Sequence, residues 1–210
     1  MASIDASITS TGLISTGDAT GILQLKSNGT TALTVHANAN VTIANGLVVS
    51  GSNVQPLVSG TSQATTSGTS FDFTGIPSWA KRITVIFSGV SSNGTSNTAL
   101  VQIGSGSVTS SGYAGGTCNQ GATATYHNAT NGFQMGTGGS AANILTGTLF
   151  ITNVTGNTWV ASGTFAYENT NFVGYTAGKI ALAGVLDRVR VGTGNGTDGF
   201  DAGNVNVFYE

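Results

Sequence analysis

The chain has 210 residues, and only 7% of them are Asp, Glu, Lys or Arg, against about 25% in an ordinary soluble domain. Its net charge is −2 and it contains no basic run, which argues against electrostatic binding to nucleic acid or to an anionic membrane. Small and hydroxyl-bearing residues take the place of charge, 32 of them glycine. Such a neutral surface suits packing against other subunits, so we expect a structural assembly protein and not an enzyme.

Residues 1–60 contain no aromatic residue, and their apolar residues come in very short alternating segments. The segments 31–35 and 40–44 each place an apolar residue at every second position, and Asn-Gly pairs at 28–29 and 45–46 punctuate them. Strands this short bury too little apolar area to be stable alone. We therefore expect residues 1–60 to form a stem shared with identical chains around a threefold axis, or an arm across a neighbouring subunit.

Residues 61–70 are Gly, Ser, Thr and Gln with a single Ala, without an apolar pattern, which predicts a linker. All aromatic residues follow it, in a head domain expected over 71–210. Alternating segments there predict strands and no helix. The expected strands are at 82–87, 99–103, 144–152, 158–167, 179–183, 187–191 and 205–209.

A compact turn at 153–157 predicts that the strands on either side of it form a hairpin. The Gly-rich stretch 104–121 and the polar stretch 127–143 are expected to be long loops. Seven or eight short strands without helices indicate an antiparallel β-sandwich, with a jelly roll as the favoured version. The residues expected to be buried between its sheets are Ile83, Val85, Phe87, Leu149, Ile151, Val160 and Phe165.

The sequence FDFTGIPSWAKRITVIF at 71–87 resembles a segment that recurs in tail-fibre-like proteins of tailed-bacteriophage virions. LDRVRV at 186–191, NGTDGFDAG at 195–203 and VNVFYE at 205–210 resemble the end of the same module. GILQLKSNGTTALTV at 21–35 is similar to segments in the shafts of phage fibres. The resemblance implies a homotrimeric virion appendage, either a tail fibre or a capsid decoration, without catalytic residues.

In that interpretation residues 1–60 attach the protein to other virion proteins, in the capsid or the tail. The first residues lack the basic start and apolar stretch of a signal peptide. We therefore expect synthesis in the cytoplasm of a bacterial host and a final location on the virion surface.

Few side chains could carry catalysis. His36 and His127 are far apart and belong to no nucleophile–base pattern, and the single cysteine, Cys118, cannot form an intrachain disulfide. Asp198 and Asp201 are expected to lie in a turn, since two carboxylates do not fill the six to eight positions of a calcium site. We predict no catalytic residue, no cofactor and no metal. A polysaccharide depolymerase, the least favoured alternative, would need acids such as Asp72, Asp198 and Asp201 to converge in one groove.

The remaining alternative is a module that binds a host surface glycan. Arg188 and Arg190 share one face of a strand and could grip an anionic glycan or a partner's carboxylate. A solvated strand face, or pairing with Asp187 or Glu210 from this or another copy, is the favoured interpretation. Some aromatic side chains could stack on sugars, although at least half of them should belong to the core. These aromatic residues are Trp79, Trp159, Tyr113, Tyr126, Tyr167 and Tyr175. The candidate surface recognition residues are Trp79, Tyr113, Tyr126, Arg188 and Arg190.

Overall fold

The computed structural model describes residues 22–43, 47–49, 52–95, 99–136 and 139–210. Over these ranges the protein is all-β, with antiparallel pairing throughout and no helix. The chain divides into two compact units, residues 1–56 and 57–210. The all-β prediction is therefore confirmed for the described residues.

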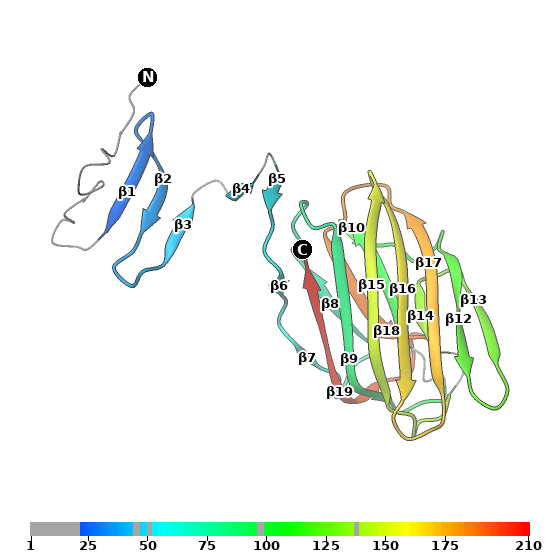
Figure 1. Cartoon of the computed structure of the whole chain (residues 1–210). Helices are drawn as coiled ribbons and strands as arrows, with labels where there is room; N and C mark the ends of the chain where they lie inside the picture. The colour runs from blue at the N-terminus through cyan, green and yellow to red at the C-terminus, as the bar shows by residue number, and fades with distance from the viewer. Residues whose placement is uncertain (1–21, 44–46, 50–51, 96–98, 137–138) are drawn as a thin grey trace. The chain divides into compact units, whose positions relative to one another are not determined.

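The N-terminal unit contains two small sheets (Figure 1). β1 (Leu23–Ser27), β2 (Thr30–Val35) and β3 (Val41–Ile43) form one of them in that order, and β4 (Leu47–Val49) pairs with β5 (Ser52–Val54). Asn28 and Gly29 connect β1 to β2 with φ values of 48° and 78°. Two successive residues with positive φ define the tight turn that Asn-Gly favours in hairpins. The other Asn-Gly pair, at 45–46, lies outside the described residues.

The second unit contains two larger antiparallel sheets. The five-stranded sheet has the order β11 (Ser107–Val108), β10 (Ala99–Ser105), β18 (Arg188–Thr193) and β8 (Ser70–Thr74), and β14 (Phe133–Met135) also pairs with β10. The nine-stranded sheet has the order β13 (Thr125–Ala129), β12 (Ala114–Gln120), β17 (Val173–Ala181), β16 (Thr158–Tyr167), β15 (Leu145–Thr155), β9 (Arg82–Ser92), β19 (Phe200–Tyr209) and β6 (Val58–Ser59), and β7 (Gln63–Ala64) also pairs with β19.

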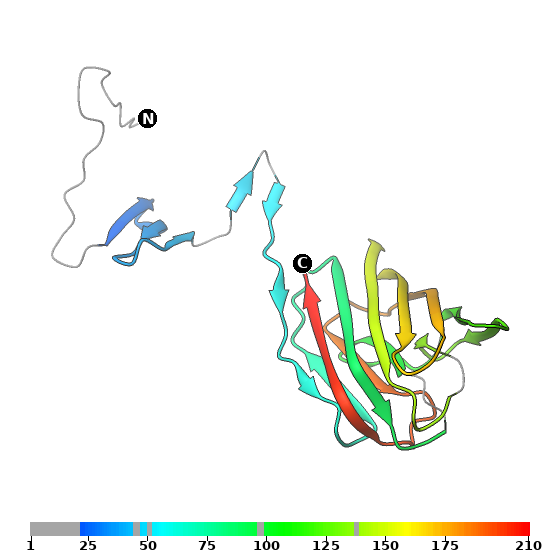
Figure 2. The same cartoon turned by 60° about the horizontal axis from the view of Figure 1, so that its bottom comes forward.

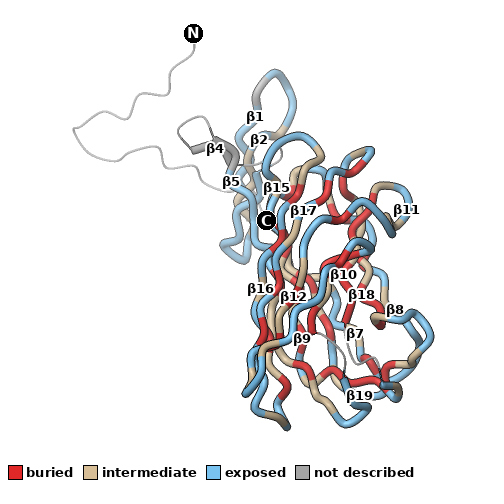
Figure 3. Tube along the Cα trace, turned by 90° about the vertical axis from the view of Figure 1, so that its right-hand side faces the viewer, coloured by how far each residue is buried: buried red, intermediate tan, exposed pale blue. Residues whose placement is uncertain are grey.

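The two large sheets face each other as two layers and contribute to one hydrophobic core (Figures 2 and 3). Val101 and Val189 enter it from the five-stranded sheet, and Ile83, Val85 and Leu149 enter it from the nine-stranded sheet. All five side chains are fully buried. The core therefore joins strands that are far apart in the sequence.

Six of the seven side chains expected in the core are buried, but the prediction for Val160 is wrong. Val160 is 40% exposed, whereas its neighbours Trp159 and Ala161 are buried. Side chains alternate between the two faces of a strand, so Phe165 shares the inward face with Trp159 and Ala161, and Val160 points away from it. The hairpin of β15 and β16 is confirmed, with Asn153 Nδ2 donating a 2.9 Å hydrogen bond to the carbonyl of Gly156 in its turn.

The expected loops at 104–121 and 127–143 are wrong as structural assignments. The first contains β11 and β12, and the second contains β14 and the end of β13. β12 pairs along its length with β17. A Cβ at Gly115 would lie 2.3 Å from the carbonyl oxygen of Ala177 on β17. Glycine at this position therefore allows two strands to approach closely, and its abundance in this stretch is misleading as a loop signal.

The range expected as a linker, 61–70, includes β7 and the first residue of β8. β7 pairs with β19. Thr65 is fully buried and its hydroxyl donates a 2.6 Å hydrogen bond to the carbonyl of Ala202. These residues belong to the second unit, because the division between the two units falls between Pro56 and Leu57.

Replacing Phe87 by Ala should lower the free energy of unfolding by about 3–5 kcal/mol, because it empties a fully packed position between the sheets. Phe87 is 2% exposed and lies on β9, between β15 and β19. Phe150→Ala is the matched control, since Phe150 is 43% exposed, and it should cost less than about 1 kcal/mol. Chemical denaturation of the two variants measures both values. Equal losses in the two variants would show that the assigned core face is wrong.

Candidate functional site

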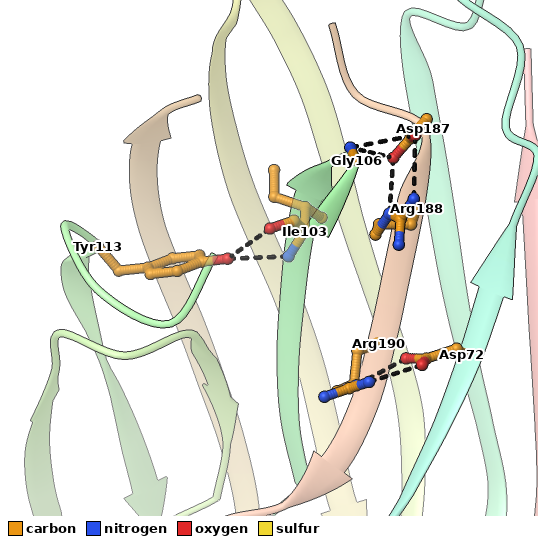
Figure 4. Close-up of polar contacts among 7 residues, drawn as sticks. All are labelled: Asp72, Ile103, Gly106, Tyr113, Asp187, Arg188 and Arg190. Atoms are coloured by element: carbon orange, nitrogen blue, oxygen red, sulfur yellow. Dashed lines mark hydrogen bonds and ion pairs between the residues drawn. The ribbon is translucent and has the colours of Figure 1, made fainter. Parts of the chain in front are cut away.

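Arg190 is held by an acidic residue on the neighbouring strand. Arg190 on β18 lies opposite Asp72 on β8. Its Nε and Nη2 each donate a 2.6 Å hydrogen bond to a different carboxylate oxygen of Asp72 (Figure 4). The bonds from Arg190 hold the pKa of Asp72 below its ordinary value, although partial burial opposes this. The guanidinium of Arg190 is therefore neutralised within the chain.

Arg188 is paired with its sequence neighbour. Its Nε donates a 2.8 Å hydrogen bond to Asp187, whose carboxylate also accepts bonds of 3.1 and 3.2 Å from the N–H of Gly106 (Figure 4). The bond from Arg188 lowers the pKa of Asp187. The expected pairing of Arg188 with Asp187 is confirmed, whereas Glu210 pairs with Arg82. The two arginines considered as anion receptors each have a carboxylate partner already.

Tyr113 is buried, so its prediction as a surface recognition residue is wrong. Only 4% of it is exposed, and its ring packs edge-on against Phe133 at 5.0 Å between centroids. Its hydroxyl accepts a 2.8 Å hydrogen bond from the N–H of Ile103 and donates one of 3.3 Å to the carbonyl of the same residue (Figure 4). Burial raises the pKa of Tyr113 to about 12. The phenol satisfies backbone groups inside the core.

The other predicted aromatic residues divide between the core and the surface. Trp159 and Tyr167 are buried, as expected for at least half of the set. Trp79 is half-buried at the periphery of the core and packs against Tyr209 at 5.9 Å between ring centroids. Only part of the Trp79 ring is therefore accessible to a ligand. Tyr126 and Tyr175 remain, and both are exposed.

Tyr126 and Tyr175 flank Cys118 on one face of the nine-stranded sheet. Tyr126 is 77% exposed and Tyr175 is 55% exposed. Both lie directly opposite Cys118 in the strand register, Tyr126 on β13 and Tyr175 on β17. Directly paired residues of antiparallel strands project from the same face. The two phenol rings therefore stand on either side of the central strand β12.

A hollow of about 280 Å³ lies between these tyrosines, and we call it the tyrosine slot. Gly116, two residues before Cys118, has no side chain, and its partner on β17 is the small residue Ala177. A Cβ at Gly116 would lie 2.7 Å from the carbonyl oxygen of His127, so close backbone approach favours glycine here. The slot is lined by Gly116, Thr117, Cys118, Tyr126, His127, Asn128, Tyr175, Thr176 and Ala177, none of which carries a formal charge when His127 is neutral.

The acidic residues considered for hydrolysis are not gathered in one hollow. Asp72 lines a hollow of about 340 Å³ with Gln63 and Tyr209, and neither Asp198 nor Asp201 lines it. Asp201 lies on β19 in the other sheet and accepts a hydrogen bond from Ser91. Within the described ranges, no cluster of three His, Cys, Asp or Glu residues has the arrangement of a metal site.

The two histidines also lie apart. His36 belongs to the N-terminal unit, where its Nε2 is 2.9 Å from the hydroxyl of Thr42. His127 belongs to the second unit and lines the tyrosine slot. No helix in the described part of the chain is long and apolar enough to span a membrane.

Comparisons with known proteins found no match: no family model, no curated protein and no solved structure is significantly similar to this chain. The tyrosine slot is therefore characterised by its own geometry. Sequence reasoning identified Tyr126 as a recognition candidate but did not place Tyr175 and Cys118 beside it. The signal that could have done so is the alternation in the segment 114–120, which its glycines obscure.

Acidification should remove the stabilising effect of the Asp72–Arg190 pair. Asp72 has a lower pKa in the folded protein than its ordinary value of 3.8. Its ionised carboxylate therefore contributes fully to folding stability above pH 3.8, and this contribution is lost as the pH falls through the folded-state pKa. The pair is partly exposed, so we expect Asp72→Asn to cost only about 0.5–1 kcal/mol at pH 7.

The unfolding free energies of wild type and Asp72→Asn, measured between pH 7 and pH 2.5, test this. The difference between the two proteins should shrink below pH 3.8, because protonation of wild-type Asp72 removes the same charge. A difference that is absent at pH 7, or that grows on acidification, would contradict the assigned pair.

Proposed function

We propose that this protein is a non-enzymatic structural component of a tailed-bacteriophage virion. In this proposal it is a short homotrimeric appendage, a tail fibre or a capsid decoration, located on the virion surface. Its N-terminal unit forms a stem that contacts the other copies and other virion proteins, and its second unit is an exposed head. The observation that carries the proposal is an apolar face in the N-terminal unit, whose described residues form no buried core.

That face follows from the strand register of β1, β2 and β3. Leu25 pairs with Leu33, which pairs with Ile43, and this row is followed on the same face by Leu23, Val35 and Val41. The opposite face carries the polar row of Gln24, Thr34 and Thr42. Among the described residues from 22 to 56, every residue whose burial is assigned is exposed or half-buried.

An apolar sheet face in water is unfavourable, and burying one Val, Leu or Ile side chain contributes about 1.5–3 kcal/mol. Three copies that turn this face toward a common axis would share one interior, with the polar row outside. Closed rotational symmetry is the usual arrangement of homo-oligomers. The low charge of the whole chain supports the same assembly, since neutral surfaces pack together without desolvating ions.

The head is proposed to be a jelly-roll-like β-sandwich, the fold of many capsid proteins. Its support is nested pairing: β9 pairs with β19, β10 with β18, β12 with β17, and β15 with β16. Winding one long hairpin into two layers produces this nesting. The sheet order departs from the usual jelly roll, because the β15–β16 hairpin lies between β9 and β17 in the same sheet.

The resemblance of residues 71–87 and of the C-terminal patches to tail-fibre-like proteins supports the virion assignment. The absence of catalysis is also part of the proposal. It is supported by the ion pairs that occupy Asp72 and Asp187, and by the position of Asp201 in the sheet opposite Asp72.

Analytical ultracentrifugation of the full chain should give three times the chain mass of 20.9 kDa. Leu33→Asp should reduce the mass to that of the monomer, since it places a charge on the apolar face of β2. Thr34→Asp is the matched control: it adds the same charge to the next residue, on the polar face, and should leave the trimer intact.

Residues 57–210 alone should remain folded, because β6 and β7 are retained to pair with β19. This fragment should associate more weakly than the full chain, because it lacks the apolar face of β1, β2 and β3. A wild-type monomer at micromolar concentration would overturn the proposal. A trimer that Leu33→Asp leaves unchanged would show that the assembly uses another surface.

The non-enzymatic assignment predicts that the purified protein releases no reducing ends from bacterial capsular polysaccharides beyond the buffer control. Sustained release would support the depolymerase alternative. If the release disappeared on changing Asp72, Asp198 or Asp201 to Asn, the non-enzymatic assignment would be overturned, whereas release insensitive to all three changes would indicate a contaminating enzyme.

A further inference from the structure

The tyrosine slot has the geometry of a clamp for one six-membered ring. Tyr126 and Tyr175 lie on strands separated by β12, so their attachment points are about 10 Å apart, twice the spacing of adjacent strands. A ring in van der Waals contact with both phenols needs about 4–4.5 Å on each side. This spacing of the attachment points leaves room for one ring between the two tyrosines.

The composition of the slot favours an uncharged, hydroxylated ligand. No Lys, Arg, Asp or Glu lines it, so it offers no permanent positive charge to neutralise a phosphate or a carboxylate. Each tyrosine presents an apolar ring and a hydroxyl, a combination that suits ligands with one apolar face and polar edges. Asn128, two residues beyond Tyr126 on the same face, adds an amide that both donates and accepts hydrogen bonds.

A peptide strand fits the slot less well than a sugar. Peptides that bind to sheets usually add to an unpaired edge through main-chain hydrogen bonds. The floor of the slot is β12, which is paired with β13 on one side and β17 on the other. Its backbone is committed to the sheet, so recognition has to come from the two rings and the amide above it.

We propose that the tyrosine slot binds a single pyranose ring of a neutral oligosaccharide, held between Tyr126 and Tyr175 and hydrogen-bonded by Asn128. The biological role of the slot rests on the proposed function. On a virion appendage, the slot would contact a neutral glycan of the host surface. The paired arginines, Arg188 and Arg190, take no part in it.

The test uses the full chain and four named probes: maltohexaose, cellohexaose, mannohexaose and the hexamer of N-acetylglucosamine. Saturation-transfer NMR detects binding, and isothermal titration calorimetry measures affinity. At least one probe should bind. Tyr126→Ala and Tyr175→Ala should each weaken binding about tenfold or more, in the range of one aromatic stacking contact.

Matched variants separate stacking from general damage. Tyr126→Phe keeps the ring and should stay within about fivefold of wild type, because one hydrogen bond between neutral groups contributes about 1 kcal/mol in water. Phe150→Ala removes an exposed aromatic ring from the same sheet outside the slot and should leave affinity unchanged. The melting temperature of each variant is measured, and affinities are compared only among variants that melt at the wild-type temperature.

Three results would overturn the inference: none of the four probes binds at millimolar concentration, the double variant Tyr126→Ala/Tyr175→Ala binds as well as wild type, or an acidic oligogalacturonate binds in preference to every neutral probe. The oligomeric state is recorded on the same samples. If the protein is a trimer and binds no probe, glycan binding at the slot is contradicted and the proposed trimer is supported. If the protein is a monomer and binds a neutral hexamer, the proposed trimer is contradicted and glycan binding at the slot is supported.

Discussion

The second unit depends on the burial of one face of β9. This strand pairs with β15 on one side and with β19 on the other, which brings the C-terminal strand beside the first long strand of the unit. Its inward residues Ile83, Val85 and Phe87 are almost completely buried against the five-stranded sheet. Burial of this face provides the favourable free energy that offsets the ordering of many long-range strand pairs.

The same physical requirement explains the contrast between the two units. In the second unit, each large sheet covers the apolar face of the other. The sheet of β1, β2 and β3 has an apolar face too, with Leu25, Leu33 and Ile43 in one row, but the described part of its unit supplies no second layer for it. A face with this pattern is stable in water only when it is covered, and the proposed trimer provides the cover from identical copies.

Glycine has a specific structural role around the tyrosine slot. At Gly115 and Gly116 a side chain would collide with the carbonyl oxygens of neighbouring strands. The two glycines therefore let β12 lie close to its partners, and Gly116 also leaves the slot open next to Cys118, between Asn128 and Ala177. A chain with so few charges has limited means of specific ionic recognition, and its two arginines at 188 and 190 are already paired. Recognition at the tyrosine slot therefore depends on shape and on contacts with its aromatic rings.

Local sequence was sufficient for the all-β class, for the hairpin at 144–167 and for six of the seven core residues, because alternation and turn residues act over a few positions. It failed at 104–121, where glycines required by close strand packing have the same composition as a loop. It also failed for Tyr113, whose ring is drawn into the core by Phe133 and Ile103. The placement of Tyr126 and Tyr175 on either side of Cys118 was decided only by the tertiary structure, because the pairing of β12 with β17 joins residues more than 50 positions apart and no local pattern specifies that register.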